Sequence, residues 1–263
     1  MNVSLDNLRI LLVEPSTAQK HHIERRLNAL GIQYIQSVVN GDLALRSLGN
    51  SAPDLVISAM HLPDMTGTDL ILKIRTGDKL RNIPFMLISS ETHYRYLEPI
   101  RQAGVIATLP KPFSRDQLEK SIYAVLDYID PEELSISGRD LEEIKVLLVD
   151  DSETSRRHIR LLLSRMGVEQ VVEVASGPQA LNEIDRDFFD LIVTDYHMPD
   201  MDGKELIECI RTDSKQSSVP ILMVSGENDD QRLAAVRQAG VSAICDKPFE
   251  PTQIKGLIER IIS

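Results

Sequence analysis

The chain contains two similar segments in one register, and this repeat limits its fold more than any other feature. DLVISAMHLPDM begins at Asp54, and DLIVTDYHMPDM begins at Asp190. The same offset of 136 residues (190 − 54) also superposes the two copies of RQAGV and the two copies of KPF. A period of this length is far too long for a solenoid and indicates two duplicated domains. We predict domains at 1–128 and 144–263, joined by a polar, turn-rich linker at 129–143.

Within each copy, short apolar runs alternate with segments of helical spacing. In the second copy KVLLVD, residues 145–150, is typical of a buried strand. The next segment opens with a cap residue, Ser152, and keeps helical spacing up to Gly167. Strands and helices alternate in this way through each copy, which predicts an α/β fold: a parallel sheet covered by helices on both faces. In such sheets ligands bind beyond the carboxyl ends of the strands.

Polar residues gather at these strand ends in the second copy. The first strand leads into Asp150 and Asp151, the third ends in Asp195, the fourth ends in Ser225, and Lys247 follows the fifth. Three carboxylates at one edge would repel one another unless a cation joined them, and hard oxygen ligands suit Mg²⁺. Metal, ammonium and hydroxyl around a carboxylate make a site for a phosphoryl group, with that carboxylate as nucleophile. Helix capping explains single residues of this set but not all five groups.

The ordered set LLVDD, DLIVTDYHMPDMDG, ILMVS and DKPF resembles the receiver domain of two-component response regulators, over the whole length of each copy. The resemblance implies two flavodoxin-like (βα)5 domains, each with a five-stranded parallel sheet of order 2-1-3-4-5. It also implies that Asp195 accepts a phosphoryl group from the phosphohistidine of a histidine kinase or a phosphotransfer protein. Output would then reach a downstream protein target by protein contact.

The same resemblance implies roles for the other residues at the strand ends. Asp151 would ligate Mg²⁺ directly, Asp150 would act through water, and the backbone carbonyl of His197 would be a further ligand. Ser225 would be the switch hydroxyl that moves to the phosphoryl group, and Lys247 would be its salt-bridge partner.

Three further expectations follow from the family. His197 and Glu227 would flank the phosphoryl group and tune its hydrolysis. Receivers usually carry an aromatic residue three positions before the lysine, and here that position is Ile244, which puts in doubt a report of the phosphorylation state through aromatic rotation. The first helix of a receiver meets the phosphodonor, and the candidate docking residues on it are Arg156, His158 and Ile159.

The first copy keeps the pattern without the reactive residues. The offset places Ala59 at the nucleophile position and Pro15 at that of the direct metal ligand. Glu14 replaces the water-mediated ligand, whereas Ser89 and Lys111 are retained. We predict a pseudo-receiver that serves as a contact module, through dimerisation, docking on the second domain or binding a partner; a redundant relic is the alternative. We expect Glu14 and Lys111 to pair with each other, because opposite charges would otherwise lack partners at this edge.

Composition excludes several classes of partner. The net charge of −11 argues against nucleic-acid binding, and residues 128–263 carry −12 of it while residues 1–127 carry +1. The chain has no run of 18 apolar residues and no basic start followed by an apolar segment. We therefore expect a cytoplasmic protein without a membrane partner.

Other functions remain as alternatives to a response regulator with protein-contact output. No effector segment follows Ser263, so we expect output by protein contact, unless the chain is the N-terminal fragment of a longer regulator with an effector domain. A phosphorylation-independent scaffold is a further alternative. We do not expect an enzyme: a dehalogenase-type phosphatase needs Asp-x-Asp and then Thr or Val after its first strand, and residues 150–153 read Asp-Asp-Ser-Glu. P-loop and GxGxxG motifs are also absent from the sequence.

Overall fold

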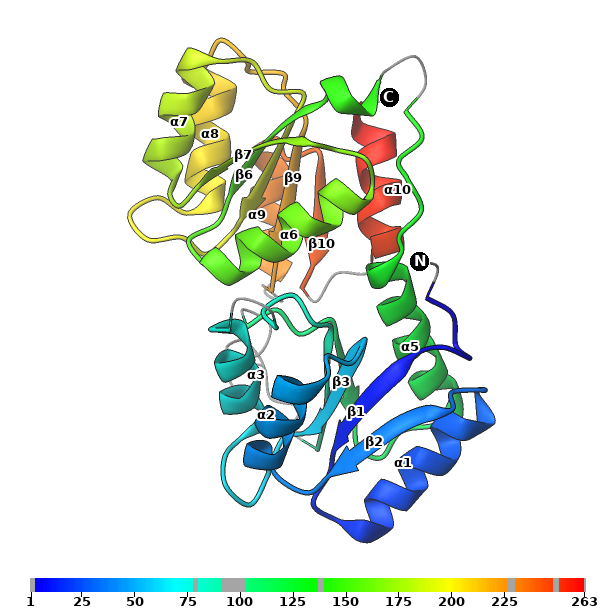
Figure 1. Cartoon of the computed structure of the whole chain (residues 1–263). Coiled ribbons are helices and arrows are strands. Elements are labelled where there is room, and N and C mark those ends of the chain that lie inside the picture. The colour runs from blue at the N-terminus through cyan, green and yellow to red at the C-terminus, as the bar shows by residue number, and fades with distance from the viewer. Residues whose placement is uncertain are drawn as a thin grey trace. The chain divides into compact units, whose positions relative to one another are not determined.

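The computed structural model describes residues 3–77, 80–90, 103–136, 140–226, 230–247 and 251–262. The chain divides into two compact units, unit 1 (Met1–Asp130) and unit 2 (Pro131–Ser263). Each unit contains a five-stranded parallel sheet, in the order β2-β1-β3-β4-β5 in unit 1 and β7-β6-β8-β9-β10 in unit 2 (Figure 1). Both are the order 2-1-3-4-5, which confirms the predicted fold class.

Unit 1 follows the predicted alternation of strands and helices. Its strands are β1 (Arg9–Val13), β2 (Tyr34–Val38), β3 (Leu55–Ala59), β4 (Phe85–Ser89) and β5 (Ala107–Pro110). Its helices are α1 (Thr17–Ala29), α2 (Gly41–Asn50), α3 (Gly67–Arg75) and α5 (Arg115–Ile129). The helix expected between β4 and β5 falls largely on residues 91–102, which lie outside the described ranges.

Unit 2 repeats this arrangement. Its strands are β6 (Lys145–Val149), β7 (Gln170–Val174), β8 (Leu191–Asp195), β9 (Ile221–Ser225) and β10 (Ala243–Asp246). Its helices are α6 (Glu153–Arg165), α7 (Gly177–Arg186), α8 (Gly203–Asp213), α9 (Asp230–Gln238) and α10 (Pro251–Ile262), preceded by the short helix η1 (Leu141–Glu143). Within the described ranges, neither unit has a helix whose length and apolar content would let it cross a bilayer.

Local signals set the boundaries of α6, the helix that follows the first strand of unit 2. The side-chain oxygen of Ser152 accepts a hydrogen bond from the backbone N–H of Ser155 at 3.3 Å, so it is the predicted N-cap. The helix ends before Gly167, whose φ of +97° lies in the left-handed region that glycine adopts without a steric penalty. Both predicted boundaries are therefore confirmed.

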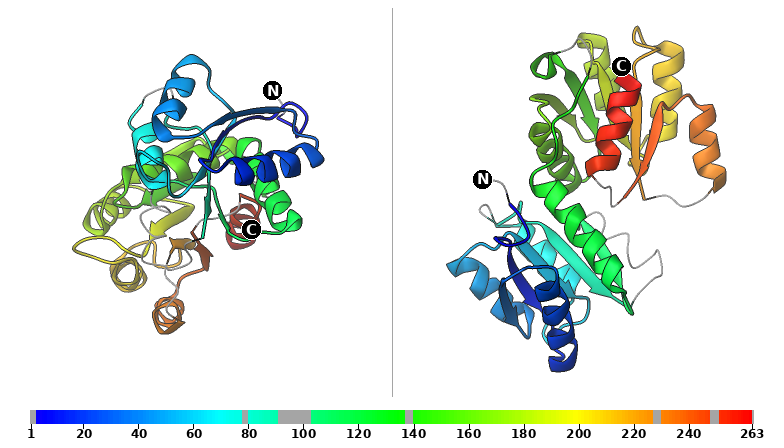
Figure 2. Two further views of the ribbon diagram at one scale, coloured as in Figure 1. Left: turned by 90° about the horizontal axis from the view of Figure 1, so that it is seen from below. Right: turned by 90° about the vertical axis from the view of Figure 1, so that its right-hand side faces the viewer.

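Helices cover both faces of the sheet in unit 2 (Figures 1 and 2). One face packs against α7, α8 and α9, through Ala180, Ile184, Leu206, Ile207, Ile210 and Val236. The strand residues in the same cluster include Leu147 and Val149, which lie two apart in β6 and therefore share one face of the sheet. The opposite face lies under α6 and α10, whose buried apolar residues are Ile159, Leu162, Leu163, Ile254, Ile258 and Ile262. Burial on both faces explains why the central strands are continuous apolar runs.

The segment between the two domains contacts unit 2. Leu134 and Ile136 are buried, and the N–H of Leu134 donates to the carbonyl of Met166 at 3.0 Å. The N–H of Ser135 donates to the Glu259 carboxylate of α10 at 2.7 Å. Most of the predicted linker, 129–143, thus falls within the second compact unit, which begins at Pro131.

Candidate functional site

Three carboxylates meet at the carboxyl edge of the sheet in unit 2. Asp150 and Asp151 follow β6, and Asp195 ends the neighbouring strand β8. The two strands pair in parallel with Val149 opposite Thr194, so that they end at the same level. One oxygen atom of each carboxylate lies within 4.8 Å of the others. The structure therefore brings together the carboxylates that the sequence predicts to converge.

Lys247 joins two of these carboxylates. Its Nζ lies 3.0 Å from Oδ2 of Asp150 and 3.1 Å from Oδ1 of Asp195. Its backbone N–H donates to the carbonyl of Ser225 at 2.8 Å, which fixes the lysine at the end of β9. Burial opposes the charged form of the lysine, but the attraction of Asp195 and Asp150 outweighs burial and raises the pKa of Lys247 above its usual value.

Burial dominates the electrostatics of Asp195, which is only 3% exposed. Removal from water raises the pKa of Asp195 to about 6, against the attraction of Lys247 and with added repulsion from Asp150. The ionised form of Asp195 is therefore less favourable in the folded protein than in water, and a further cation beside the carboxylate would reduce this difference.

Ser225 and His197 lie at the same edge of the sheet. Ser225 ends β9 and is fully buried. His197 is partly exposed, and its ring packs edge-on against that of Tyr196, with the ring centroids 4.8 Å apart. Ile244 is partly buried and packs against the core of unit 2. Glu227, predicted to tune hydrolysis, lies outside the described residues.

Asp150 is fixed by donors that the sequence did not suggest. Its Oδ1 accepts from the N–H of Ser152 at 2.8 Å, and its Oδ2 accepts from the hydroxyl of Ser155 at 2.5 Å. Ser155 is buried in the first turn of α6. No motif in the sequence distinguished it from the other polar residues of this helix. With Lys247 as a third donor, the carboxylate is held from three directions.

A second residue missed by the sequence is Gly203, at the start of α8. Its N–H donates to the carbonyl of Tyr196 at 2.8 Å. A Cβ at this position would lie 2.3 Å from the backbone oxygen of Asp195. Glycine is therefore needed for α8 to begin directly beside Asp195. The available signal was its alignment with Gly67, where a Cβ would lie 2.7 Å from the oxygen of Ala59.

The docking residues expected on the first helix of this domain need a correction. Ile159 is only 3% exposed, so the expectation that it meets a partner is wrong. It lies on the apolar stripe of α6 together with Leu162 and Leu163. Arg156 is also partly buried, and it donates to the backbone carbonyl of Asp150 at 2.6 Å. A docking role for His158, which is partly exposed, stays a prediction.

The equivalent edge of unit 1 holds a closed ion pair. Nζ of Lys111 lies 3.0 Å from Oε2 of Glu14, which confirms the predicted pairing. Glu14 is 3% exposed and also accepts from the N–H of Ser16 at 3.0 Å. Ala59 ends β3, and neither it nor the partly buried Pro15 offers a side-chain ligand. Ser89 is buried at the end of β4.

The donor set of unit 2 fits a magnesium ion. Mg²⁺ prefers oxygen ligands at 2.0–2.1 Å in octahedral geometry, so that opposite ligands lie about 4.2 Å apart. Carboxylate oxygens within 4.8 Å of one another can share one ion when two of them ligate it and the third reaches it through a water molecule. Asp151 is exposed, which leaves an open side where ligating waters would remain. The residues described in unit 1 provide no comparable cluster.

The comparison with known families agrees with the geometry. Residues 10–123 and 146–259 both match the response regulator receiver domain. The chain belongs to this family. Its two matches establish a tandem of receiver domains, one in each compact unit.

Two chemotaxis proteins each match a little under half of this chain over nearly their own full length. The chemotaxis protein CheY1 of Helicobacter pylori is 36% identical over 120 residues, which cover 45% of this chain and 97% of that protein. The chemotaxis protein CheY of Pseudomonas aeruginosa is 37% identical over 118 residues, with coverage of 45% and 95%. A solved receiver domain of a sensor histidine kinase from Pseudomonas aeruginosa PAO1, with a magnesium ion coordinated in its active-site cleft, is 28% identical, with coverage of 45% and 97% and a TM-score of 0.42.

Proposed function

We propose that the second receiver accepts a phosphoryl group on Asp195 in a Mg²⁺-dependent reaction, and that the first receiver is a non-phosphorylated contact module. One observation carries the proposal. Asp150, Asp151 and Asp195 converge within 4.8 Å beside Lys247 in unit 2, whereas Ala59 occupies the nucleophile position in unit 1. The donor would be the phosphohistidine of a histidine kinase or phosphotransfer protein, the partners that receivers of this family use.

The transfer step follows from the chemistry of the groups at the edge. An oxygen of Asp195 attacks phosphorus, the P–N bond to the donor imidazole breaks, and the imidazole leaves with the bonding electrons and takes up a proton. Lys247, 3.1 Å from Oδ1 of Asp195, places a positive charge where the phosphoryl oxygens would arrive. Its raised pKa keeps the ammonium charged at neutral pH. The hydroxyl of Ser225 supplies a hydrogen-bond donor at the same edge.

Asp151 and Asp195 would hold the metal directly, Asp150 through a water molecule, and the backbone carbonyl of His197 would complete the protein ligands. A bound Mg²⁺ supplies charge neutralisation for the phosphoryl oxygens. The protein prepares this site by holding the carboxylates of Asp150 and Asp195, both at most 3% exposed, against their mutual repulsion.

Phosphorylation would act on the surface through the ends of β9 and β10. Ser225 ends β9 and Lys247 follows β10, so a phosphoryl group that draws both side chains toward itself changes the surface at the carboxyl ends of these strands. Moving such a surface from about 1:99 to 99:1 in favour of the active conformation requires about 5.5 kcal/mol of differential binding. Output by contact with a downstream protein uses this change.

The first receiver is suited to contact rather than to reaction. Ala59 ends β3 where Asp195 ends β8, so this receiver has no carboxylate there that could accept a phosphoryl group. Its Lys111 pairs with the buried Glu14 at 3.0 Å. Its surface could bind a second copy of the chain, the second receiver or a separate partner protein. We also propose that the chain is not an enzyme acting on a separate substrate, because the phosphoryl group passes to a residue of the protein itself, Asp195.

Reduction of the aspartyl phosphate tests the proposal and locates the acceptor. The protein is incubated with acetyl phosphate and Mg²⁺, reduced with borohydride, which converts an aspartyl phosphate to homoserine, and digested for peptide mass mapping. Homoserine is expected at position 195 and at no other aspartate. No homoserine after incubation would favour the phosphorylation-independent scaffold. Homoserine in a peptide of unit 1 would contradict the assignment of that unit as a pseudo-receiver.

A further inference from the structure

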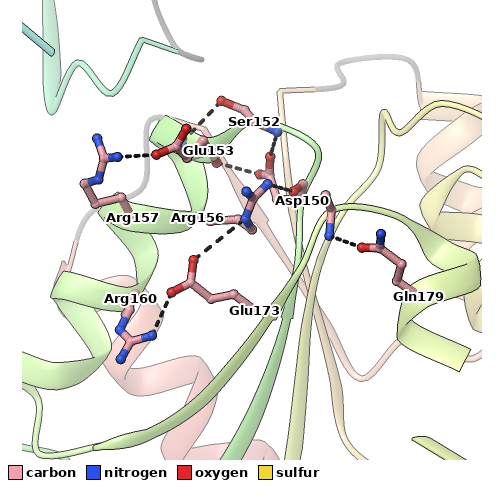
Figure 3. Close-up of polar contacts among 10 residues, drawn as sticks. Asp150, Ser152, Glu153, Arg156, Arg157, Arg160, Glu173 and Gln179 are labelled. Carbon is pink, nitrogen blue, oxygen red and sulfur yellow. Dashed lines mark hydrogen bonds and ion pairs between the residues drawn. The ribbon is translucent and has the colours of Figure 1, made fainter. Parts of the chain in front are cut away.

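The backbone of Asp150 is tied to β7 through both of its polar groups. Its N–H donates to the carbonyl oxygen of Val174 at 3.3 Å. Its carbonyl oxygen accepts from Nη1 of Arg156 at 2.6 Å, and Nε of the same guanidinium lies 3.7 Å from Oε2 of Glu173. Figure 3 shows Arg156 between Asp150 and Glu173. Two adjacent residues of β7 therefore hold the two sides of Asp150, one directly and one through Arg156.

Glu173 is itself held by a second arginine of α6. Nη1 of Arg160 lies 2.8 Å from Oε1 of Glu173, so each carboxylate oxygen faces a different guanidinium group (Figure 3). The Arg156 side chain is 16% exposed and that of Arg160 is 53% exposed. The inner arginine thus joins Glu173 to the metal-binding edge, while the outer arginine fixes Glu173 from the solvent side.

If Arg156 and Glu173 support the reactive site, unit 1, which lacks that site, need not keep them, and the two units do differ at these positions. Unit 1 keeps the direct link, because the N–H of Glu14 donates to the carbonyl of Val38 at 3.0 Å. At the positions of Arg156 and Glu173, however, it has Lys20 and Ser37. The hydroxyl of Ser37 donates to Glu24 at 2.6 Å instead. A single ammonium opposite a neutral hydroxyl does not reproduce a guanidinium that serves two acceptors at once.

The carboxylate of Asp150 experiences strong and opposed forces. Asp195 repels it, and Lys247 attracts both groups. Fixing the backbone of Asp150 confines its side chain to the geometry in which Oδ1 accepts from the N–H of Ser152. A donor for its carbonyl oxygen supplies this restraint, because a guanidinium is planar and presents several N–H groups in a rigid fork.

We propose that Arg156 and Glu173 are positioning residues that hold Asp150 in place for the metal site. The inference rests on the proposed function of unit 2 and adds to it two residues outside the set of metal ligands. Outer partners of metal ligands typically change metal affinity by about 10- to 100-fold. Arg156 acts on Asp150 directly, and Glu173 acts only by orienting Arg156.

The test compares variants of the whole chain by two measurements. Arg156→Lys keeps the charge and introduces the residue that unit 1 has, and Glu173→Gln removes one charge with little change of shape. Arg157→Lys is the matched control, because Arg157 pairs with Glu153 on the same helix and not with the site. The affinity for Mg²⁺ is measured by titration calorimetry without phosphodonor. The exchange rate of the Ser152 amide is measured by NMR in metal-free protein.

Arg156→Lys is expected to lower the Mg²⁺ affinity about tenfold and to speed exchange of the Ser152 amide. Arg157→Lys should change neither quantity. Glu173→Gln should act in the same direction, and adding it to Arg156→Lys should cause no further loss, because its effect passes through the arginine.

The results separate this inference from the proposed function. Equal Mg²⁺ affinity and equal Ser152 exchange in the Arg156→Lys and Arg157→Lys variants would overturn the positioning role while the function stands. If the wild type bound no Mg²⁺, the proposed function would fail, and the exchange of the Ser152 amide in metal-free protein would still decide whether Arg156 holds Asp150.

Discussion

Replacement of Asp195 by Asn should stabilise the metal-free protein at neutral pH. Burial and the repulsion of Asp150 together outweigh the attraction of Lys247, and the pKa of Asp195 rises from 3.8 to about 6. At 1.36 kcal/mol per pH unit, this difference corresponds to about 3 kcal/mol. Asparagine has nearly the same shape without the charge, and Lys247 keeps its contact with Asp150 at 3.0 Å. Asp195→Asn should therefore raise the free energy of unfolding by up to about 3 kcal/mol at pH 7.

The pH dependence fixes the sign of this effect. Folded Asp195 binds its proton more tightly than the unfolded chain does, so the protonated form contributes stability that is fully present below about pH 3.8. That contribution is lost as the pH rises through about 6. The wild type and Asp195→Asn should therefore be similarly stable near pH 4. Between pH 4 and pH 6 the free energy of unfolding of the wild type should fall below that of Asp195→Asn. Above pH 7 the difference between the two proteins should be constant.

Urea unfolding in chelator measures this difference. The chain has no tryptophan, so circular dichroism follows the transition, and hydrogen exchange of amides in β8 assigns it to unit 2. Asp200→Asn is the control: Asp200 is exposed in the loop after β8, has a φ of 69° that asparagine tolerates, and should change stability by less than about 0.5 kcal/mol. A destabilising Asp195→Asn, or a difference that is the same at pH 4.5 and pH 7.5, would refute the reasoning.

Three further outcomes are expected. Mg²⁺ at 100 times its dissociation constant should stabilise unit 2 of the wild type by about 2.7 kcal/mol, and should stabilise Asp195→Asn much less, as thermal melts with and without chelator will show. Lys111→Met should lower the free energy of unfolding of unit 1 by about 2 kcal/mol in urea, because it removes the cation that pairs with the buried Glu14. Fully buried pairs typically lose about 3–5 kcal/mol in this way, and a smaller loss is expected here because the lysine side chain is 25% exposed. Gly203→Ala should cost about 1–3 kcal/mol and weaken Mg²⁺ binding, because its Cβ would lie 2.3 Å from the backbone oxygen of Asp195; an unchanged calorimetric titration would contradict this.

The fold could be predicted from the sequence because the repeat and the residues at the strand ends are two independent sources of information. The offset that aligns Asp195 with Ala59 also aligns every strand, so one domain supports the reading of the other. The carboxyl ends of parallel strands lie at one edge, and this rule alone predicts that Asp150 and Lys247, 97 residues apart in the chain, share one site.

The sequence did not reveal the residues that support the ligands. The contact of Ser155 with Asp150 and that of Arg156 with Glu173 depend on how α6 lies against the sheet, and this is set by packing of the whole helix face. Residue type gave no sign, because serine and arginine are common on exposed helix surfaces. The close approach at Gly203 likewise depends on where α8 begins.

The error at Ile159 has a different cause. The helical spacing of Ile159 with Leu162 and Leu163 already indicated a buried stripe, which the structure confirms. The position of the first helix in the family predicts which helix meets a partner, but it does not say which face of that helix each residue occupies. Periodicity was the better guide at this position.

Intact mass spectrometry tests the central claim most directly. The wild type and Asp195→Asn are each incubated with acetyl phosphate, with Mg²⁺ or with excess chelator. We predict one added phosphoryl group, about 80 Da, on the wild type with Mg²⁺, and none in the other three samples. A phosphoryl group on Asp195→Asn, or two on the wild type, would contradict the assignment of one reactive receiver and one pseudo-receiver.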